Sequence, residues 1–124
     1  MIRLDDRVWI LWAIWILLFP AQWLFGAAAA ACVHETGHIL AVLLLGGNVQ
    51  RIDIGPFGAK IHAVGIEGVR EALCALAGPA GSFLCLLLIR KLPVLGLCAL
   101  VQGCFNLLPV YPLDGGRVLS CLLK

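Results

Sequence analysis

The stretch AAAAACVHETGHILAVLLL, residues 27–45, places two histidines and one acid in the middle of an otherwise apolar segment. Glu35 is the only Asp, Glu, Lys or Arg between positions 8 and 50. A bilayer core of about 30 Å is crossed by roughly 20 helical residues, so this segment is long enough to span a membrane. The order His34-Glu35-Thr36-Gly37-His38 therefore predicts a helix that carries ionisable groups at membrane depth.

The spacing of this HExxH motif is typical of a metal site. On a helix, positions i and i+4 lie on one face, so both imidazoles can bind one ion while Glu35 lies beside a metal-bound water. Two histidines satisfied within a protein core are the simpler alternative. Ionisable groups inside a membrane are costly unless they are paired or functional, however, which favours a zinc site at His34 and His38.

The composition of the whole chain points to a membrane protein. Of its 124 residues, 62% are hydrophobic and 13% are charged. This excludes a disordered chain, and a domain of this length leaves so much surface exposed that lipid is needed to cover it. The formal net charge is only +2 and no basic cluster is present, which argues against a nucleic-acid partner.

Stretches without charge predict an all-α polytopic membrane protein with about four transmembrane helices. Pro20 should end or kink the first helix, and Gly46 and Gly47 should end the second. A cleaved signal peptide would leave a soluble remainder, which this apolar sequence does not resemble. We expect the spans at about residues 8–25, 27–45, 72–89 and 94–108.

The orientation follows from the Lys and Arg residues in the short loops, which favour the cytosolic side. Arg90 and Lys91 lie on one side of the predicted membrane. Most of the others share the opposite side, so we expect both termini in the cytosol. These majority residues are Arg3, Arg7, Arg51, Lys60, Arg70, Arg117 and Lys124.

Residues 48–68, between the second and third spans, differ in pattern from the rest. Apolar and polar residues alternate on both sides of Gly55-Pro56-Phe57-Gly58, which predicts a short β-hairpin. Two interpretations stay open: a plain surface hairpin, or an edge strand that pairs with an extended peptide.

A catalytic zinc usually has three protein ligands and an open position for water, so a third ligand must come from elsewhere. Asp114 follows the fourth apolar segment within FNLLPVYPLDGGR, residues 105–117. Its prolines and glycines break the helix, and irregular backbone at membrane depth is tolerated when it is buried or lines a wet cavity. An ordinary turn explains Asp114 as well, and the remaining candidates are His62, Asp53, Glu67 and Glu71.

Taken together, these motifs resemble the site-2 proteases, zinc metalloproteases that cut within or near membrane-spanning segments. Their HExxH helix is matched by residues 34–38. The stretch AGPAG, residues 77–81, and the Pro56-Phe57-Gly58 turn look like the branch that includes the sporulation-type processing proteases. Their second signature, NxxPxxPxDG, is matched by Asn106, Pro109, Pro112, Asp114 and Gly115.

The resemblance implies a set of roles. His34, His38 and Asp114 would hold Zn²⁺, Glu35 would be the catalytic base, and Asn106 would bind the substrate backbone. Residues 1–124 would form a single intramembrane metalloprotease domain, a multi-pass protein of a bacterial cytoplasmic membrane. Its partners would be the lipid bilayer, a membrane-anchored protein substrate cut in regulatory proteolysis, and a membrane regulatory protein.

Two other classes of protein share some of these features. A proton-coupled transporter also buries His, Glu and Asp at membrane depth, but it usually shows paired repeats and more spans and does not need HExxH. A catalytically inactive relative would keep the fold as a binding protein, although the complete set of motif residues speaks against it. The sequence therefore predicts a zinc-dependent intramembrane endopeptidase.

Overall fold

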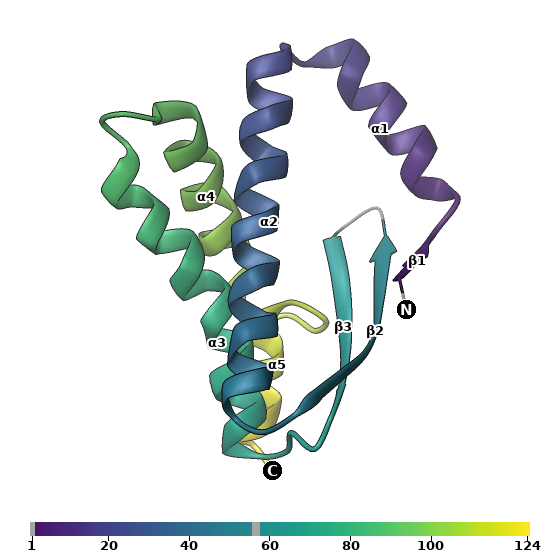
Figure 1. Cartoon of the computed structure of the whole chain (residues 1–124), viewed down its shortest axis with the longest axis vertical. Coiled ribbons are helices and arrows are strands. Elements are labelled where there is room, and N and C mark those ends of the chain that lie inside the picture. The colour runs from purple at the N-terminus through teal and green to yellow at the C-terminus, as the bar shows by residue number, and fades with distance from the viewer. Residues whose placement is uncertain (1, 56–57) are drawn as a thin grey trace.

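The protein is a set of helices with a small three-stranded sheet along one side (Figure 1). The computed structural model describes residues 2–55 and 58–124, so Pro56 and Phe57 of the predicted hairpin turn lie outside the described residues. The elements in chain order are β1 (Ile2–Leu4), α1 (Arg7–Leu18), α2 (Ala21–Leu44), β2 (Asn48–Gly55), β3 (Gly58–Val64), α3 (Val69–Leu84), the 3-10 turn η1 (Cys85–Leu88), α4 (Pro93–Asn106) and α5 (Asp114–Leu122).

Helix α2 is the central element. Its buried residues recur every four positions, so they form one stripe along the helix. The small members of this stripe let α3 and α4 approach closely, and Ala30 is fully buried against Ala99 and Cys85. The stripe consists of Gly26, Ala30, His34, His38 and Val42, which places both histidines on the face that packs against the neighbouring helices.

Among the described residues, two helical segments are long and apolar enough to cross a membrane: α2, and α3 together with η1 over Val69–Leu88. The apolar helices α1 and α4 have 12 and 14 residues. At about 1.5 Å per residue they are roughly 18 and 21 Å long, shorter than a bilayer core. The structure therefore supports two of the four predicted spans by length.

The predicted boundary between the first two spans is wrong. We expected them over 8–25 and 27–45, whereas α1 ends at Leu18 and α2 begins at Ala21. Pro20 precedes the first turn of α2, where its carbonyl accepts the N–H groups of Trp23 and Leu24. Because proline is tolerated at a helix start, where its missing N–H would have no partner, Pro20 separates two helices rather than kinking one.

The later predicted spans also differ at their ends. The third, expected over 72–89, begins three residues earlier at Val69 and changes to a 3-10 turn at Cys85. The fourth, expected over 94–108, is α4 over Pro93–Asn106, with proline in its first turn. These shifts leave the motif residues in the elements in which the sequence placed them, apart from Asp114, which begins a helix that was not predicted.

The predicted β-hairpin is confirmed. Strands β2 and β3 are antiparallel, with Asn48 opposite Val64 and Gly55 opposite Gly58. The hairpin ends at Val64 rather than at 68, because Gly65 and Gly68 have φ values of +84° and +61° that leave the extended conformation. A third strand was not predicted: β1 pairs in parallel with β2, so the fold contains more β-structure than one hairpin.

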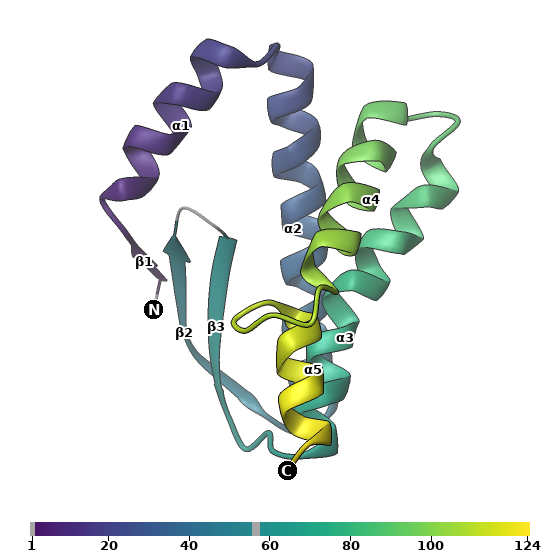
Figure 2. The same ribbon diagram turned by 180° about the vertical axis from the view of Figure 1, so that it is seen from behind.

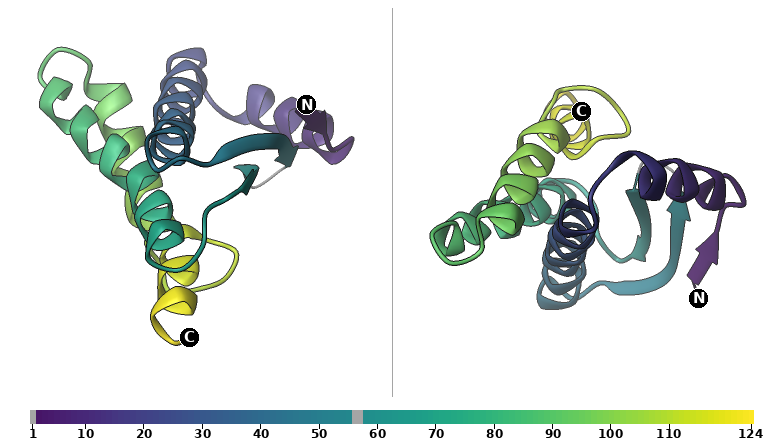
Figure 3. Two further views of the ribbon diagram at one scale, coloured as in Figure 1. Left: turned by 60° about the horizontal axis from the view of Figure 1, so that its bottom comes forward. Right: turned by 90° about the horizontal axis from the view of Figure 1, so that it is seen from above.

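The other elements form two groups on opposite sides of α2. Figure 3 shows α3 and α4 on one side of α2, and the sheet with α1 on the other. Figure 2 shows α5, with the loop that precedes it, lying along α3 on the side of the sheet. The α1–α2 and α3–α4 connections lie at one end of the molecule, and the C-terminus lies at the opposite end.

Candidate metal centre

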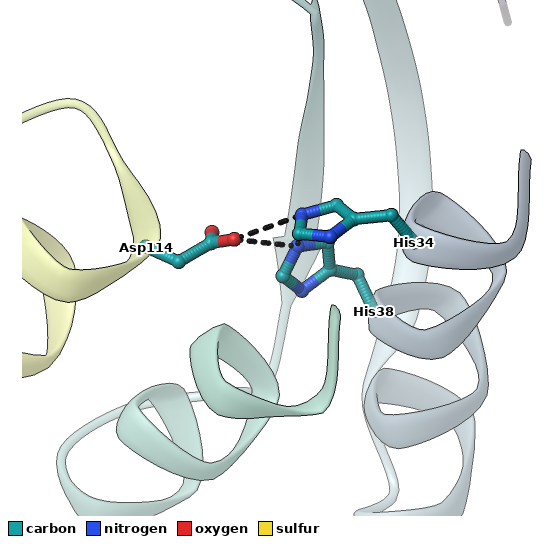
Figure 4. Close-up of side chains that lie close together, drawn as sticks. All are labelled: His34, His38 and Asp114. Atoms are coloured by element: carbon teal, nitrogen blue, oxygen red, sulfur yellow. Dashed lines mark hydrogen bonds and ion pairs between the residues drawn. The ribbon is translucent and has the colours of Figure 1, made fainter. Parts of the chain in front are cut away.

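Three buried side chains meet where α2, α3 and α5 come together (Figure 4). The carboxylate oxygen Oδ2 of Asp114 lies 3.0 Å from Nε2 of His34 and 3.1 Å from Nε2 of His38. The two Nε2 atoms lie 3.2 Å apart. The exposed fractions of His34, His38 and Asp114 are 2%, 6% and 6%, so water has little access to the group.

The donor chemistry of this group calls for a positive charge between the two rings and the carboxylate. Nδ1 of His38 lies 2.7 Å from the carbonyl oxygen of Cys74, which can only accept, so Nδ1 carries the proton. In the neutral ring, Nε2 then carries a lone pair, and this lone pair faces the negative oxygen of Asp114. Two acceptors held this close repel each other unless a positive charge, either a proton or a metal ion, lies between them.

The spacing of the three atoms fits zinc. Zinc–nitrogen and zinc–oxygen bonds of about 2.0–2.1 Å in a tetrahedral site place the ligand atoms about 3.3 Å apart. The observed separations of 3.0–3.2 Å are close to this value. Two imidazoles and one carboxylate are also a ligand set found in catalytic zinc sites, where the fourth position is left for water.

The two histidines are positioned by close packing of α2 against α3. They lie one turn apart on the buried stripe of α2. Gly78 of α3 lies directly against the His38 ring, where a Cβ atom would overlap the imidazole. A glycine is therefore required at this position for the two helices to approach.

Asp114 is positioned by the irregular segment between α4 and α5. Gly115 and Gly116 pack directly against the backbone of residues 107–111, where side chains would collide with it. Asp114 thus begins α5, where the positive end of the helix dipole favours a carboxylate. Its second oxygen, Oδ1, lies 3.6 Å from Nη1 of Arg117, and the residue is only 6% exposed, unlike an aspartate in an ordinary surface turn.

Glu35 lies on the neighbouring face of α2, beside the two histidines. All three residues line a cavity of about 910 Å³ between the helices and the sheet. Oε2 of Glu35 is buried and has no hydrogen-bond partner within residues 2–55 and 58–124. A buried carboxylate oxygen is costly to leave unpaired, so this atom is available to a group that enters the cavity.

Asn106 lines the same cavity from the end of α4. Its Nδ2 donates a hydrogen bond of 2.9 Å to the backbone carbonyl of Gln102, one turn earlier. This bond holds the amide over the cavity. The structure therefore brings Asn106 to the same cavity as the metal-binding group.

The other candidate third ligands do not join this group. His62 Nε2 lies 2.9 Å from Asp53 Oδ2 on the hairpin, and Arg51 Nε lies 3.0 Å from Asp53 Oδ1. Partial burial opposes ionisation of Asp53, but His62 and Arg51 outweigh it and hold the pKa of Asp53 below its usual range. Glu67 is exposed, and Glu71 lines the cavity apart from the three ligand atoms.

Sequence reasoning missed three residues around the site. Ser82 Oγ lies 2.9 Å from Nδ1 of His34, and the Cys74 carbonyl binds His38. Gln102 lines the cavity with a buried Oε1 that has no hydrogen-bond partner in the described part of the chain. A serine, a backbone carbonyl and a glutamine have no motif of their own. The four-residue spacing of Cys74, Gly78 and Ser82 is a signal that could have indicated a shared helix face.

Two histidines from HExxH, one carboxylate and a neighbouring glutamate with one unpaired oxygen are residue types found together in the sites of zinc-dependent hydrolases. The chain matches the Peptidase M50B-like family over residues 8–111. It is 31% identical over 130 residues to a zinc metalloprotease of Methanocaldococcus jannaschii, covering 93% of this chain and 36% of that protein. It is 36% identical over 126 residues to a Synechocystis sp. protein that carries the name of a zinc metalloprotease, covering 88% of this chain and 32% of the relative.

A solved structure gives the same assignment. The site-2 protease from Methanocaldococcus jannaschii superposes with a TM-score of 0.79 at 26% identity, over 98% of this chain and 66% of that one. The chain belongs to the Peptidase M50B-like family, the site-2 proteases. It spans about a third of the length of the two curated relatives. The resemblance drawn from the motifs is confirmed, and the sporulation-type branch stays a prediction.

Proposed function

We propose that this chain carries the active site of a zinc-dependent intramembrane endopeptidase that hydrolyses peptide bonds in or near membrane-spanning segments. One observation carries the proposal: three buried ligand atoms meet beside the unpaired Oε2 of Glu35 on an apolar helix long enough to cross a membrane. Membership of a zinc metalloprotease family supports it. Regulatory proteolysis of membrane-anchored proteins is the biological role that we assign to it.

His34, His38 and Asp114 would hold the zinc. Bound zinc supplies a water of lowered pKa, about 7, and polarises the scissile carbonyl. Glu35 accepts the proton of the attacking water through its free oxygen and delivers it to the nitrogen of the leaving amine. Burial of the three ligand residues excludes bulk water, which strengthens the electrostatic interactions within the site.

The substrate must be extended to be cut, because the peptide bonds of a helix are hidden by their own hydrogen bonds. Strand β3 is at the edge of the sheet, and its residues 58–63 line the cavity with the metal-binding group. An extended peptide adds readily to such an edge. The amide of Asn106 and the unpaired Oε1 of Gln102 would then bind backbone groups of the peptide from the opposite wall.

We further propose that four spans hold the active site in a bacterial cytoplasmic membrane with both termini in the cytosol. The connections at residues 19–20 and 89–92 lie at one end of the molecule, as a four-span arrangement requires (Figure 1). The many exposed apolar side chains of α1 and α4 fit contact with lipid or with a membrane regulatory protein. Labelling of Lys60→Cys from the outer side of the membrane would contradict this orientation.

The decisive experiment uses the Glu35→Gln variant, because glutamine keeps the shape of the side chain but cannot accept a proton. We expect full zinc content and a 10²- to 10⁴-fold loss of cleavage of a membrane-anchored model substrate. Glu67→Gln, an exposed glutamate on the connection to α3, is the matched control and should cleave normally.

The same experiment separates the protease from both alternatives. Neither a transporter nor an inactive binding protein would cleave the substrate in either form. Undiminished proteolysis by Glu35→Gln would remove this residue from the mechanism.

A further inference from the structure

We propose that Ser82 is a positioning residue that fixes the orientation and tautomer of His34 for metal binding. This inference rests on the proposed metal centre, but it concerns a residue outside both sequence motifs. Ser82 contacts Nδ1 of His34, the ring nitrogen on the far side from the metal-binding Nε2, so it acts on the metal centre through that ring.

The contact between Ser82 and His34 is short and is shielded from solvent. Ser82 Oγ lies 2.9 Å from Nδ1 of His34, and the exposed fractions of the two residues are 0% and 2%. Water cannot reach either atom to replace the bond. Nδ1 of His34 therefore depends on this hydroxyl for its hydrogen bond, since a buried ring nitrogen left unpaired is costly.

The second histidine shows what this contact does. Nδ1 of His38 donates to the carbonyl oxygen of Cys74 at 2.7 Å, and its Nε2 faces Asp114. His34 repeats this arrangement, with Ser82 Oγ at Nδ1 and Asp114 at Nε2. Both orienting groups come from α3, and each leaves the Nε2 lone pair free for the ion.

The register of α3 explains how one helix serves both rings. Cys74, Gly78 and Ser82 are spaced by four residues, so they lie on one face, and all three are buried. The Cys74 carbonyl contacts His38, Gly78 leaves room for the same ring, and Ser82 contacts His34 one turn earlier in α2. This face of α3 therefore contacts and orients both metal-binding rings.

The chemistry assigns a direction to the Ser82 bond. A histidine that binds a metal through Nε2 must carry its proton on Nδ1, so Ser82 Oγ accepts it. Without the oxygen, Nδ1–H of His34 has no hydrogen-bond partner among residues 2–55 and 58–124. Partners of this kind around metal-binding histidines typically change metal affinity by about 10- to 100-fold when they are removed.

Cobalt(II) titration of the purified full chain in detergent tests this inference, because cobalt occupies zinc sites and its visible absorption reports coordination directly. We expect Ser82→Ala to bind cobalt about 10- to 100-fold more weakly. Ser120→Ala, which removes the same hydroxyl from an exposed position on α5, is the matched control and should bind like the unsubstituted protein. Ser82→Thr, which keeps the hydroxyl, should restore most of the affinity.

Thermal unfolding of the metal-free proteins separates positioning from packing. If Ser82→Ala unfolds earlier but binds cobalt with unchanged affinity, Ser82 only fills space and the inference is overturned. If Ser82→Ala does not fold, the Ser82→Thr titration decides, because weak binding by a folded Thr variant contradicts the role of the hydroxyl. Failure of the unsubstituted protein to bind cobalt would contradict the metal centre itself and this inference with it.

Discussion

Two clusters built from histidine and aspartate face the same cavity, and their surroundings give them different chemistry. In the cluster between the helices, His34, His38 and Asp114 are at most 6% exposed. In the cluster on the hairpin, the side chains of Arg51, Asp53 and His62 are each about a third exposed. The hairpin cluster contains its own cation within 3.0 Å of the carboxylate, whereas the nearest guanidinium to Asp114 is 3.6 Å away, on the oxygen that faces away from the histidines.

This difference shows why residue types alone do not define a metal site. A carboxylate already paired with a guanidinium and partly hydrated has little to gain from an ion. A buried carboxylate that faces two imidazole lone pairs has a strong need for one. The charge balance and burial of each cluster, rather than its composition, decide which one binds a metal.

The largest expected effect tests this comparison directly. Asp114→Ala and Asp53→Ala remove the same carboxylate from the two clusters. We expect Asp114→Ala to lose most of its zinc and all measurable proteolysis, because the ion is left with two protein ligands. Asp53→Ala should retain about one zinc per chain. Metal analysis of the purified proteins checks both.

The opposite result would reverse the roles of the two clusters. If Asp53→Ala or His62→Ala lost zinc while Asp114→Ala kept it, the third ligand would come from the hairpin. The three side chains of the helical cluster would then have to rearrange when the metal binds.

The parts of the site that could be predicted from the sequence are those set by helix periodicity and by short motifs. The i, i+4 spacing of His34 and His38 was sufficient to place them on one face, and the family signature assigned Asp114. The residues alone could not choose between Asp114 and Asp53, because the choice depends on how α5 and the hairpin fold back against α2. Ser82 lies outside both motifs and was not predicted as a site residue, because a hydroxyl contact between two helices has no local signature.

The fold was predicted less completely than the site, for similar reasons. The alternation over residues 48–64 was enough to predict the hairpin. Strand β1 has only three residues, too few for a period of two to be recognised, and its partner is more than 40 residues away. Apolar composition predicted helices at α1 and α4 but could not give their lengths, because nothing in a uniformly apolar stretch marks where a helix ends apart from Pro20 and Pro93.

A smaller effect is expected from the packing that holds the helical cluster. Gly78→Ala would place a methyl group against the imidazole of His38. We expect a loss of zinc affinity of about tenfold or more, since the ring must move away from the other two ligands. Gly81→Ala, three residues further along α3, adds a methyl group at ordinary contact distance, 3.4 Å from the Val33 carbonyl.

Competition with a zinc-binding dye measures both affinities. Equal affinity for the two variants would show that the His38 ring adapts freely, and the helical cluster would then be less rigid than its packing indicates. Substitutions on the hairpin are not expected to change the zinc affinity in this way, because the side chains of the hairpin cluster are about a third exposed.

The smallest expected effect concerns the hairpin cluster and its response to pH. The pKa of Asp53 is lower in the folded protein than in the unfolded chain, because His62 and Arg51 favour its charged form despite partial burial. Its contribution to stability is therefore present above the unfolded pKa of an aspartate, about 3.9, and is lost as the pH falls through the lower folded value. Asp53→Asn should lower the unfolding midpoint slightly at pH 6, and the difference from the unsubstituted protein should shrink steadily as the pH falls below about 4. Comparing the two proteins at each pH cancels the titration of all other carboxylates, including Asp114. A difference that stays constant or grows on acidification would show that Asp53 acts through packing rather than through its charge. The hairpin cluster would then not be balanced by its own charges, and the contrast with the helical cluster would not hold.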